Sequence, residues 1–208
     1  MLDQLRAALG PATRELDLIS PYLIPGEEGT EMLGAIVARG VRVRVLTNAL
    51  AATDTAVVHT GYARYRERLL RDGVQLYELK PGAGEREDSR RPRLGGSSSA
   101  SLHAKTAAVD RKRVFVGSFN YDPRSQRLNT ELGLVMEDTP LAARVSEVFD
   151  TRIPDDAYEV RLAADGRGLE WIERTREGEV VYTTEPQTGW PRRLLVQVLS
   201  LLPLEPLL

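Results

Sequence analysis

The chain contains 208 residues, of which 42% are hydrophobic and 28% are charged. At this length we expect one large domain, or one domain with an appendage, whose core needs neither disulfides nor a structural metal. The absence of cysteine excludes thiolate zinc sites, iron–sulfur clusters, cysteine nucleophiles and disulfide bonds. The 28 basic and 30 acidic residues give a net charge of -2, which disfavours a dedicated nucleic-acid binder.

No apolar run in the sequence is long enough to cross a membrane. The most apolar stretch, residues 194–208, is short and is interrupted by polar residues and prolines. The first ten residues mix Asp3, Gln4 and Arg6 with apolar residues, so they lack the apolar core of an export signal. We therefore expect a soluble chain with a surface-seeking C-terminal tail.

Strand and helix patterns alternate over the first 150 residues, which predicts βαβ units around a mostly parallel or mixed sheet. A short opening helix is expected before the first strand. Residues 80–100 show no hydrophobic periodicity, so they are expected to form a loop, in which Arg90, Arg91 and Arg93 are interpreted as solvated charges. The expected strands are 15–20, 41–46, 74–79, 102–109, 113–119 and 130–137, and the expected helices are 30–39 with Thr30 as its cap, 57–71 and 139–149.

The sequence pattern changes after Asp150. Turn signals at Asp165-Gly166 and Glu177-Gly178 separate three short strand patterns, which predicts an antiparallel meander. We therefore divide the chain into a catalytic α/β part, residues 1–150, and an extension, residues 151–208. The expected strands of the extension are 158–164, 169–174 and 179–184, and its final helix is 192–201.

The expected final helix carries apolar residues at helical spacing and follows Trp190, Arg192 and Arg193. Two interpretations fit such a pattern: the apolar face packs on the protein core, or it lies at a bilayer interface. Core packing is the favoured interpretation for this helix.

Two histidines, His59 and His103, are available for proton or phosphoryl transfer near neutral pH. Lys105 stands two positions after His103, so on a strand both side chains project from one face. An imidazole beside an ammonium suits attack on a phosphodiester, because the cation holds the non-bridging oxygens while the ring acts as nucleophile or acid. Two positions after His59 the sequence has Gly61 instead of a lysine, so we favour a structural role for His59.

Further polar residues follow His103 at short intervals. The hydroxyl of Ser118 and the amide of Asn120 come at the end of the next expected strand, where both can reach the same phosphate. A carboxylate is needed to fix the imidazole tautomer, and Glu131 on the following strand is the candidate. The chain shows no cluster of carboxylates or histidines at metal-ligand spacing, so we expect neither a metal nor another cofactor.

A single histidine on a strand is more often an ordinary, partly buried ring than a catalyst. The run from His103 to Asn120, however, has the spacing H-x-K-x4-D-x6-G-S-x-N, which resembles the HKD signature of the phospholipase D superfamily. The resemblance implies that His103 is the nucleophile or its acid/base counterpart. It also implies that Lys105, Ser118 and Asn120 bind phosphate, Asp110 is a structural carboxylate, and Glu131 orients the histidine.

The resemblance extends over nearly the whole chain. The segments 20–26, 120–125, 129–131 and 201–205 all resemble the second half of bacterial cardiolipin synthases of the C type. This implies an α/β fold, with a phospholipase D-like mixed sheet flanked by helices and a small C-terminal meander and helix. It also implies transfer of a phosphatidyl group between two phospholipids through a phosphohistidine, with a phosphatidylglycerol-type donor.

The chain departs from the superfamily pattern because it carries one HKD motif, whereas these enzymes use two that face each other. We therefore expect a second HKD half as partner, supplied by homodimerisation or by an N-terminal half. The resemblance implies a cytoplasmic location, with peripheral contact at the inner membrane. Two alternatives stay open: a homodimeric phosphodiesterase or nuclease, which the acidic charge and the long extension disfavour, and a catalytically inactive half.

Overall fold

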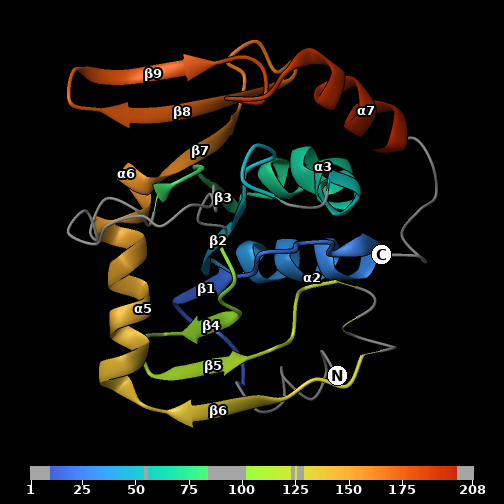
Figure 1. Cartoon of the computed structure of the whole chain (residues 1–208). Coiled ribbons are helices and arrows are strands. Elements are labelled where there is room, and N and C mark those ends of the chain that lie inside the picture. The colour runs from blue at the N-terminus through green and yellow to red at the C-terminus, as the bar shows by residue number, and fades with distance from the viewer. Residues whose placement is uncertain (1–9, 54–55, 84–101, 123–124, 126–128, 201–208) are drawn as a thin grey trace, which may run out of the picture.

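A computed structural model describes residues 10–53, 56–83, 102–122, 125 and 129–200. Within this range the strands form one nine-stranded mixed sheet in the order β6-β5-β4-β1-β2-β3-β7-β8-β9 (Figure 1). The expected opening helix and the Arg90, Arg91 and Arg93 cluster lie outside the described residues. The strands are β1 Glu15–Ile19, β2 Arg42–Asn48, β3 Gln75–Leu79, β4 Thr106–Val109, β5 Arg113–Gly117, β6 Gly133–Glu137, β7 Ala157–Leu162, β8 Leu169–Thr175 and β9 Gly178–Tyr182, and the helices are α2 Gly26–Ala38, α3 Ala56–Arg71, α5 Thr139–Thr151, α6 Ile153–Asp156 and α7 Trp190–Ser200.

The centre of the sheet is parallel. Strands β1, β2 and β3 pair in parallel and are connected by α2 and α3, as the alternating sequence pattern predicts. In β2, Val43 and Val45 face the core below these helices, while Arg44 points to the opposite face and pairs with Asp17 of β1 at 2.6 Å. Alternation along one strand therefore supplies an apolar layer on one face and a buried ion pair on the other.

Helix α2 begins four residues earlier than predicted, because Pro25 rather than Thr30 occupies the N-cap. Thr30 lies inside the helix and is buried, and its hydroxyl donates to the carbonyl of Gly26 at 2.7 Å. The first turn contains Glu27 and Glu28 but no apolar residue, so hydrophobic periodicity does not reveal it. Acidic side chains at a helix N-terminus are favoured by the helix dipole.

Antiparallel strands extend the sheet on both sides. On one side β4 pairs with β1, and β5 and β6 follow; on the other side β7 pairs with β3, and β8 and β9 follow. Helix α5 covers the opposite face of the sheet from α2 and α3, and α7 packs against α3 (Figure 1). The prediction of a mixed sheet flanked by helices, with a C-terminal meander and helix, is confirmed.

A buried polar cluster joins the C-terminal strands to α3. Arg66 of α3 pairs with Glu78 of β3 and with Glu185, in each case at 2.9 Å. The indole N–H of Trp171 donates to Glu78 at 2.8 Å, and the ring nitrogen Nε2 of His59 lies 3.3 Å from Glu185. All five side chains are buried. His59 therefore makes a structural contact inside this cluster.

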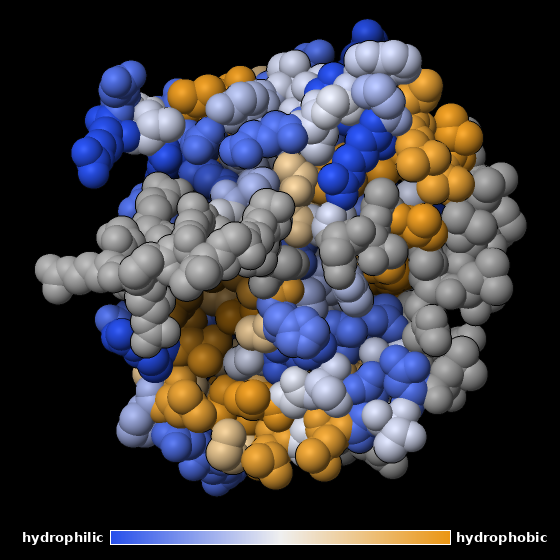
Figure 2. All heavy atoms as spheres, viewed as in Figure 1, coloured by the Kyte–Doolittle hydropathy of each residue, from blue (hydrophilic) through white to orange (hydrophobic). Residues whose placement is uncertain are grey.

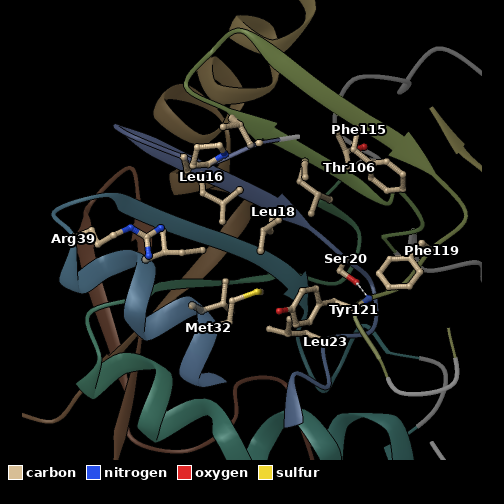
Figure 3. A pocket seen from close by; sticks show the side chains of 18 residues that line it. Leu16, Leu18, Ser20, Leu23, Met32, Arg39, Thr106, Phe115, Phe119 and Tyr121 are labelled. Carbon is tan, nitrogen blue, oxygen red and sulfur yellow. Dashed lines mark hydrogen bonds between the residues drawn. The ribbon is translucent and has the colours of Figure 1, made fainter. Parts of the chain in front are cut away.

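An apolar cavity of about 360 Å³ lies between α2 and the strands β1, β4 and β5 (Figure 3). Leu18, Met32 and Phe115 contribute to its walls. Phe119 and Tyr121 also line it, and they belong to the segment that follows β5. Its lining is almost entirely apolar, so it offers packing surface but few groups suited to chemistry.

Candidate active site

His103 and Lys105 lie immediately before β4 and not on it, since this strand begins at Thr106. The prediction that both occupy a strand is therefore wrong. The ladder between β4 and β1 ends where Thr106 pairs with Ile19, because β1 stops there and Pro21, two residues later, has no N–H to continue the pairing. The two side chains nevertheless lie together, with Lys105 Nζ 3.4 Å from His103 Nε2.

The segment that carries the two residues is held from both sides. The side chain of Asn48, at the end of β2, accepts from the N–H of Leu102 at 3.0 Å and donates to its carbonyl at 3.3 Å. On the other side, the N–H of Gly117 donates to the carbonyl of Lys105 at 3.1 Å. Sequence reasoning missed Asn48, whose signal is an amide at the end of a buried strand.

His103 is exposed, whereas Lys105 is buried. Burial lowers the pKa of Lys105, and the negative charges of Glu131 and Asp122 oppose this effect. The ammonium also donates to the carbonyl of His103 at 2.9 Å. An ammonium is a donor only, so it can bind Nε2 only while that nitrogen carries no proton. This is the protonation state that a nucleophilic imidazole requires.

Ser118 and Glu131 meet at the ends of β5 and β6. The Ser118 hydroxyl donates to Glu131 and accepts from the N–H of Leu132 at 3.0 Å. The other carboxylate oxygen of Glu131 accepts from Ser125 at 3.0 Å and from Asn129 at 3.2 Å. Burial raises the pKa of Glu131, but these hydrogen bonds and the charge of nearby Lys105 outweigh it, so the pKa is lowered.

Hydrogen bonds of Glu131 within the described part of the chain go to Ser118, Ser125 and Asn129, and none reaches His103. Its role in orienting the imidazole therefore stays a prediction. Ser125 and Asn129 were not predicted as site residues. Their signal in the sequence is weak, since both are small polar residues in a connection between strands.

Asn120 is half-buried, and its side-chain oxygen Oδ1 is buried without a hydrogen-bond partner among the described residues. A buried polar atom left unpaired costs about 1–3 kcal/mol. Rotation of the amide by 180° about its terminal bond would present an N–H donor at this place. Such a donor is what an anionic ligand requires.

Asp110 lies at the turn between β4 and β5, where Asp110 and Arg111 have φ values of 54° and 56°. Its carboxylate accepts from the backbone N–H groups of Thr13 at 3.0 Å, Arg14 at 2.7 Å and Glu15 at 3.0 Å, and from the Thr13 hydroxyl at 2.8 Å. Burial raises the pKa of Asp110, but these hydrogen bonds outweigh it and the pKa is lowered. The contacts are those of a structural carboxylate at the start of β1.

Neither a metal-binding cluster nor a membrane-spanning helix is found among the described residues. The described residues contain no group of three or more histidine, aspartate or glutamate side chains that could hold a metal ion. No helix within the same range is long and apolar enough to cross a membrane.

The sheet and the spacing of the motif define a phospholipase D-like fold. A family profile described as "Cardiolipin synthase, PLD-like domain" matches residues 5–153, and the chain belongs to this family. It is 44% identical to cardiolipin synthase C of Escherichia coli K12 over 96% of this chain and 42% of the relative. It is 32% identical to cardiolipin synthase A of Pseudomonas entomophila over 77% of this chain and 29% of the relative. The chain thus spans less than half of the length of these relatives.

Solved structures agree with the fold assignment. The phospholipase D family member Nuc from Salmonella typhimurium superimposes with a TM-score of 0.55 at 20% identity, over 77% of this chain and 90% of that chain. Phosphatidylserine synthase from Haemophilus influenzae superimposes with a TM-score of 0.58 at 15% identity, over 99% of this chain and 44% of that chain. At these identities the similarity establishes a common fold.

Proposed function

We propose that this chain is the motif-bearing half of a phosphatidyltransferase of the cardiolipin synthase type. The observation that carries the proposal is the pairing of the exposed His103 with the buried Lys105, whose Nζ lies 3.4 Å from Nε2. The 44% identity to a cardiolipin synthase supports a phospholipid as substrate. The donor is a phosphatidylglycerol-type lipid and the acceptor is a second phospholipid that carries a free hydroxyl.

The proposed reaction has two displacements at one phosphorus. In the first, His103 Nε2 attacks the phosphodiester, the bond to the headgroup oxygen breaks, and a second histidine protonates the leaving oxygen. In the second displacement, the hydroxyl of the acceptor attacks the phosphorus of the phosphohistidine, and the second histidine removes the proton of this hydroxyl. The bond between phosphorus and His103 breaks, which releases His103. Lys105, Ser118 and Asn120 stabilise the charge on the non-bridging oxygens.

The second histidine must come from another HKD half. His59 cannot supply it, because it is buried against Glu185 in the cluster on α3. The surface next to Ser118 supports a partner, since Val116, Leu132 and Leu134 are exposed there at the ends of β5 and β6. Apolar side chains are visible over these strands in Figure 2. Contiguous apolar surface beside a site is typical of an interface.

The test uses mixed micelles of phosphatidylglycerol and detergent, with the full chain assayed over a dilution series and after addition of an N-terminal HKD half. We expect a double-phosphate lipid as product, formed either by a dimer of this chain or by the mixed pair. His103→Ala should abolish turnover while the circular dichroism spectrum stays unchanged, since the covalent route is lost. Lys105→Ala should lower kcat/KM about 100- to 1,000-fold, and Lys112→Ala, which changes an exposed lysine of the same hairpin, should leave it unchanged.

Three outcomes would contradict the proposal. Cleavage of single- or double-stranded DNA, with the lipid untouched, would establish the homodimeric nuclease instead. No turnover under any pairing would establish the inactive half. An active monomer that persists on dilution would show that the second HKD half is not required.

A further inference from the structure

One side of helix α7 is apolar and exposed. It is formed by Trp190, Leu194, Leu195 and Val198, and we call it the α7 apolar face. Their exposed fractions are 69%, 50%, 49% and 52%. The helix packs on α3 with its other side, where Val196 is buried. The expectation that these apolar residues pack on the core is therefore wrong for this face. Figure 2 shows hydrophobic surface over α7.

The charges on α7 are all positive. The helix contains Arg192 and Arg193 and no acidic residue. The guanidinium of Arg192 donates to the carbonyl of Thr53 at 2.7 Å, and that of Arg193 donates to the carbonyl of Thr188 at 2.8 Å. Both partners are neutral, so these hydrogen bonds hold the side chains in place, and neither guanidinium forms an ion pair with another of the described residues. An apolar face beside two arginines complements an anionic, partly apolar surface.

Helix α7 contacts the segment that follows β2, the strand whose last residue also holds the chain next to His103. Arg192 contacts Thr53, which follows the end of β2 by five residues. The last residue of the same strand, Asn48, holds Leu102 next to His103. Both contacts are therefore made at the carboxyl end of β2 or just beyond it.

We propose that α7 docks this chain on an anionic lipid bilayer, with the α7 apolar face at the level of the headgroups and upper acyl chains. The chemistry of the helix fits this occupant. Tryptophan is enriched at membrane interfaces, and the two arginines attract anionic headgroups. Its 11 residues are too few to cross the bilayer, so the helix lies in the plane of the interface. The inference rests on the proposed function, for which the bilayer is the source of substrate.

Binding to vesicles tests the proposal without any turnover. The full chain is floated with vesicles of phosphatidylcholine mixed with phosphatidylglycerol, and with vesicles of phosphatidylcholine alone. We expect binding to the mixed vesicles, weakening with added salt. The double variant Leu194→Ser/Val198→Ser should partition about tenfold or more weakly, because two apolar contacts with lipid are lost. Val180→Ser/Val181→Ser, which changes two exposed valines of β9, is the matched control and should bind as the unchanged chain does.

Tryptophan emission supplies a second readout. The chain has two tryptophans, of which Trp171 is buried and Trp190 is exposed. Mixed vesicles should shift the emission to the blue, and Trp190→Phe should abolish the shift while Trp171 still emits.

Equal binding of the Leu194→Ser/Val198→Ser variant and the unchanged chain would overturn the proposal, and so would failure of the unchanged chain to bind. A change in oligomeric state, rather than in partition, would show that a second copy covers the face. Turnover in detergent micelles does not require docking, so failure of docking is distinguished from failure of the proposed reaction. His103→Ala should still bind the vesicles.

Discussion

Asp110 is a charged residue of the motif whose contacts are all structural. Its carboxylate accepts hydrogen bonds from three successive backbone N–H groups at the start of β1. The residue also adopts a positive φ of 54°, a conformation that aspartate tolerates better than most residues do. At this position the requirement for a carboxylate comes from the fold.

Replacing Asp110 by Asn should destabilise the protein by about 3 kcal/mol, because an amide presents only one acceptor oxygen to the N–H groups of Thr13, Arg14 and Glu15. The lowered pKa means that the carboxylate contributes stability that is lost as the pH falls through its folded value. The difference between the two proteins should therefore shrink on acidification. Urea unfolding at neutral and acidic pH measures both effects.

The matched control is Asp165→Asn, which changes an exposed turn residue that accepts one N–H bond from Arg167. Its free energy of unfolding should stay within about 0.5 kcal/mol of the unchanged chain. Equal effects of the two substitutions would contradict the structural role of Asp110.

The charge stabilisation that Lys105, Ser118 and Asn120 are proposed to provide leads to a prediction about metals. Turnover should be unaffected by saturating chelator. The ammonium of Lys105 and neutral hydrogen-bond donors at the phosphate do the work that a metal ion would otherwise do. The assay uses detergent micelles with and without the chelator. Strong loss of activity that one divalent ion restores would contradict the prediction.

At the scale of elements, the polar cluster of Arg66, Glu78, Glu185, His59 and Trp171 joins α3, β3 and β8. Burial raises the pKa of Glu185, but the charges of Arg66 and His59 and their hydrogen bonds outweigh it and lower the pKa to about 2. For Glu78 burial outweighs the opposing charge of Arg66, so the pKa of Glu78 is raised. The pairing with Arg66 therefore favours ionised Glu185.

Glu185→Gln should destabilise the protein by about 3 kcal/mol near neutral pH, because it breaks a buried ion pair. Because the pKa of Glu185 is lower in the folded than in the unfolded protein, its carboxylate stabilises the folded state above the unfolded pKa. This contribution should be lost as the pH falls from about 4.5 to about 2. Urea unfolding at several pH values measures the difference. Glu177→Gln, at an exposed turn, is the control and should change stability little; a pH-independent effect of Glu185→Gln would contradict the assignment.

Prediction from sequence succeeded where the signal is local. The spacing from His103 to Asn120 covers one hairpin and its flanks, and within it His103 and Lys105 lie together as predicted. It failed where partners are distant in the chain. Asn48 is 54 residues from Leu102, and Glu185 is 126 residues from His59. The α7 apolar face was misassigned for a different reason, because a helical pattern shows which side is apolar but not what covers it.

At the scale of the molecule, one continuous sheet crosses the division that we made at residue 150. Strand β7 pairs with β3, and Trp171 of β8 reaches Glu78. The family profile ends near the same place, at residue 153. The separation of residues 1–150 from residues 151–208 stays a prediction, and truncation tests it.

A chain cut after residue 153 should lose cooperative unfolding, because β3 becomes an open edge and the buried charges of Arg66 and Glu78 lose two of their partners. Thermal denaturation followed by circular dichroism measures this against the full chain. A cooperative transition within a few degrees of the full chain would instead establish residues 1–153 as a folding unit.

The Asp110 contacts also have a consequence for folding kinetics. Thr13 and Asp110 are 97 residues apart, so the hydrogen bonds between them close a long loop that contains β2, α3 and β3. Closing long loops slows folding, because entropy is lost before the contact is gained. The motif should therefore take its final shape late in refolding. A peptide of residues 103–120 would contain every residue of the motif but would lack the three backbone N–H groups that hold Asp110. We therefore expect that the motif does not adopt its native conformation outside this fold.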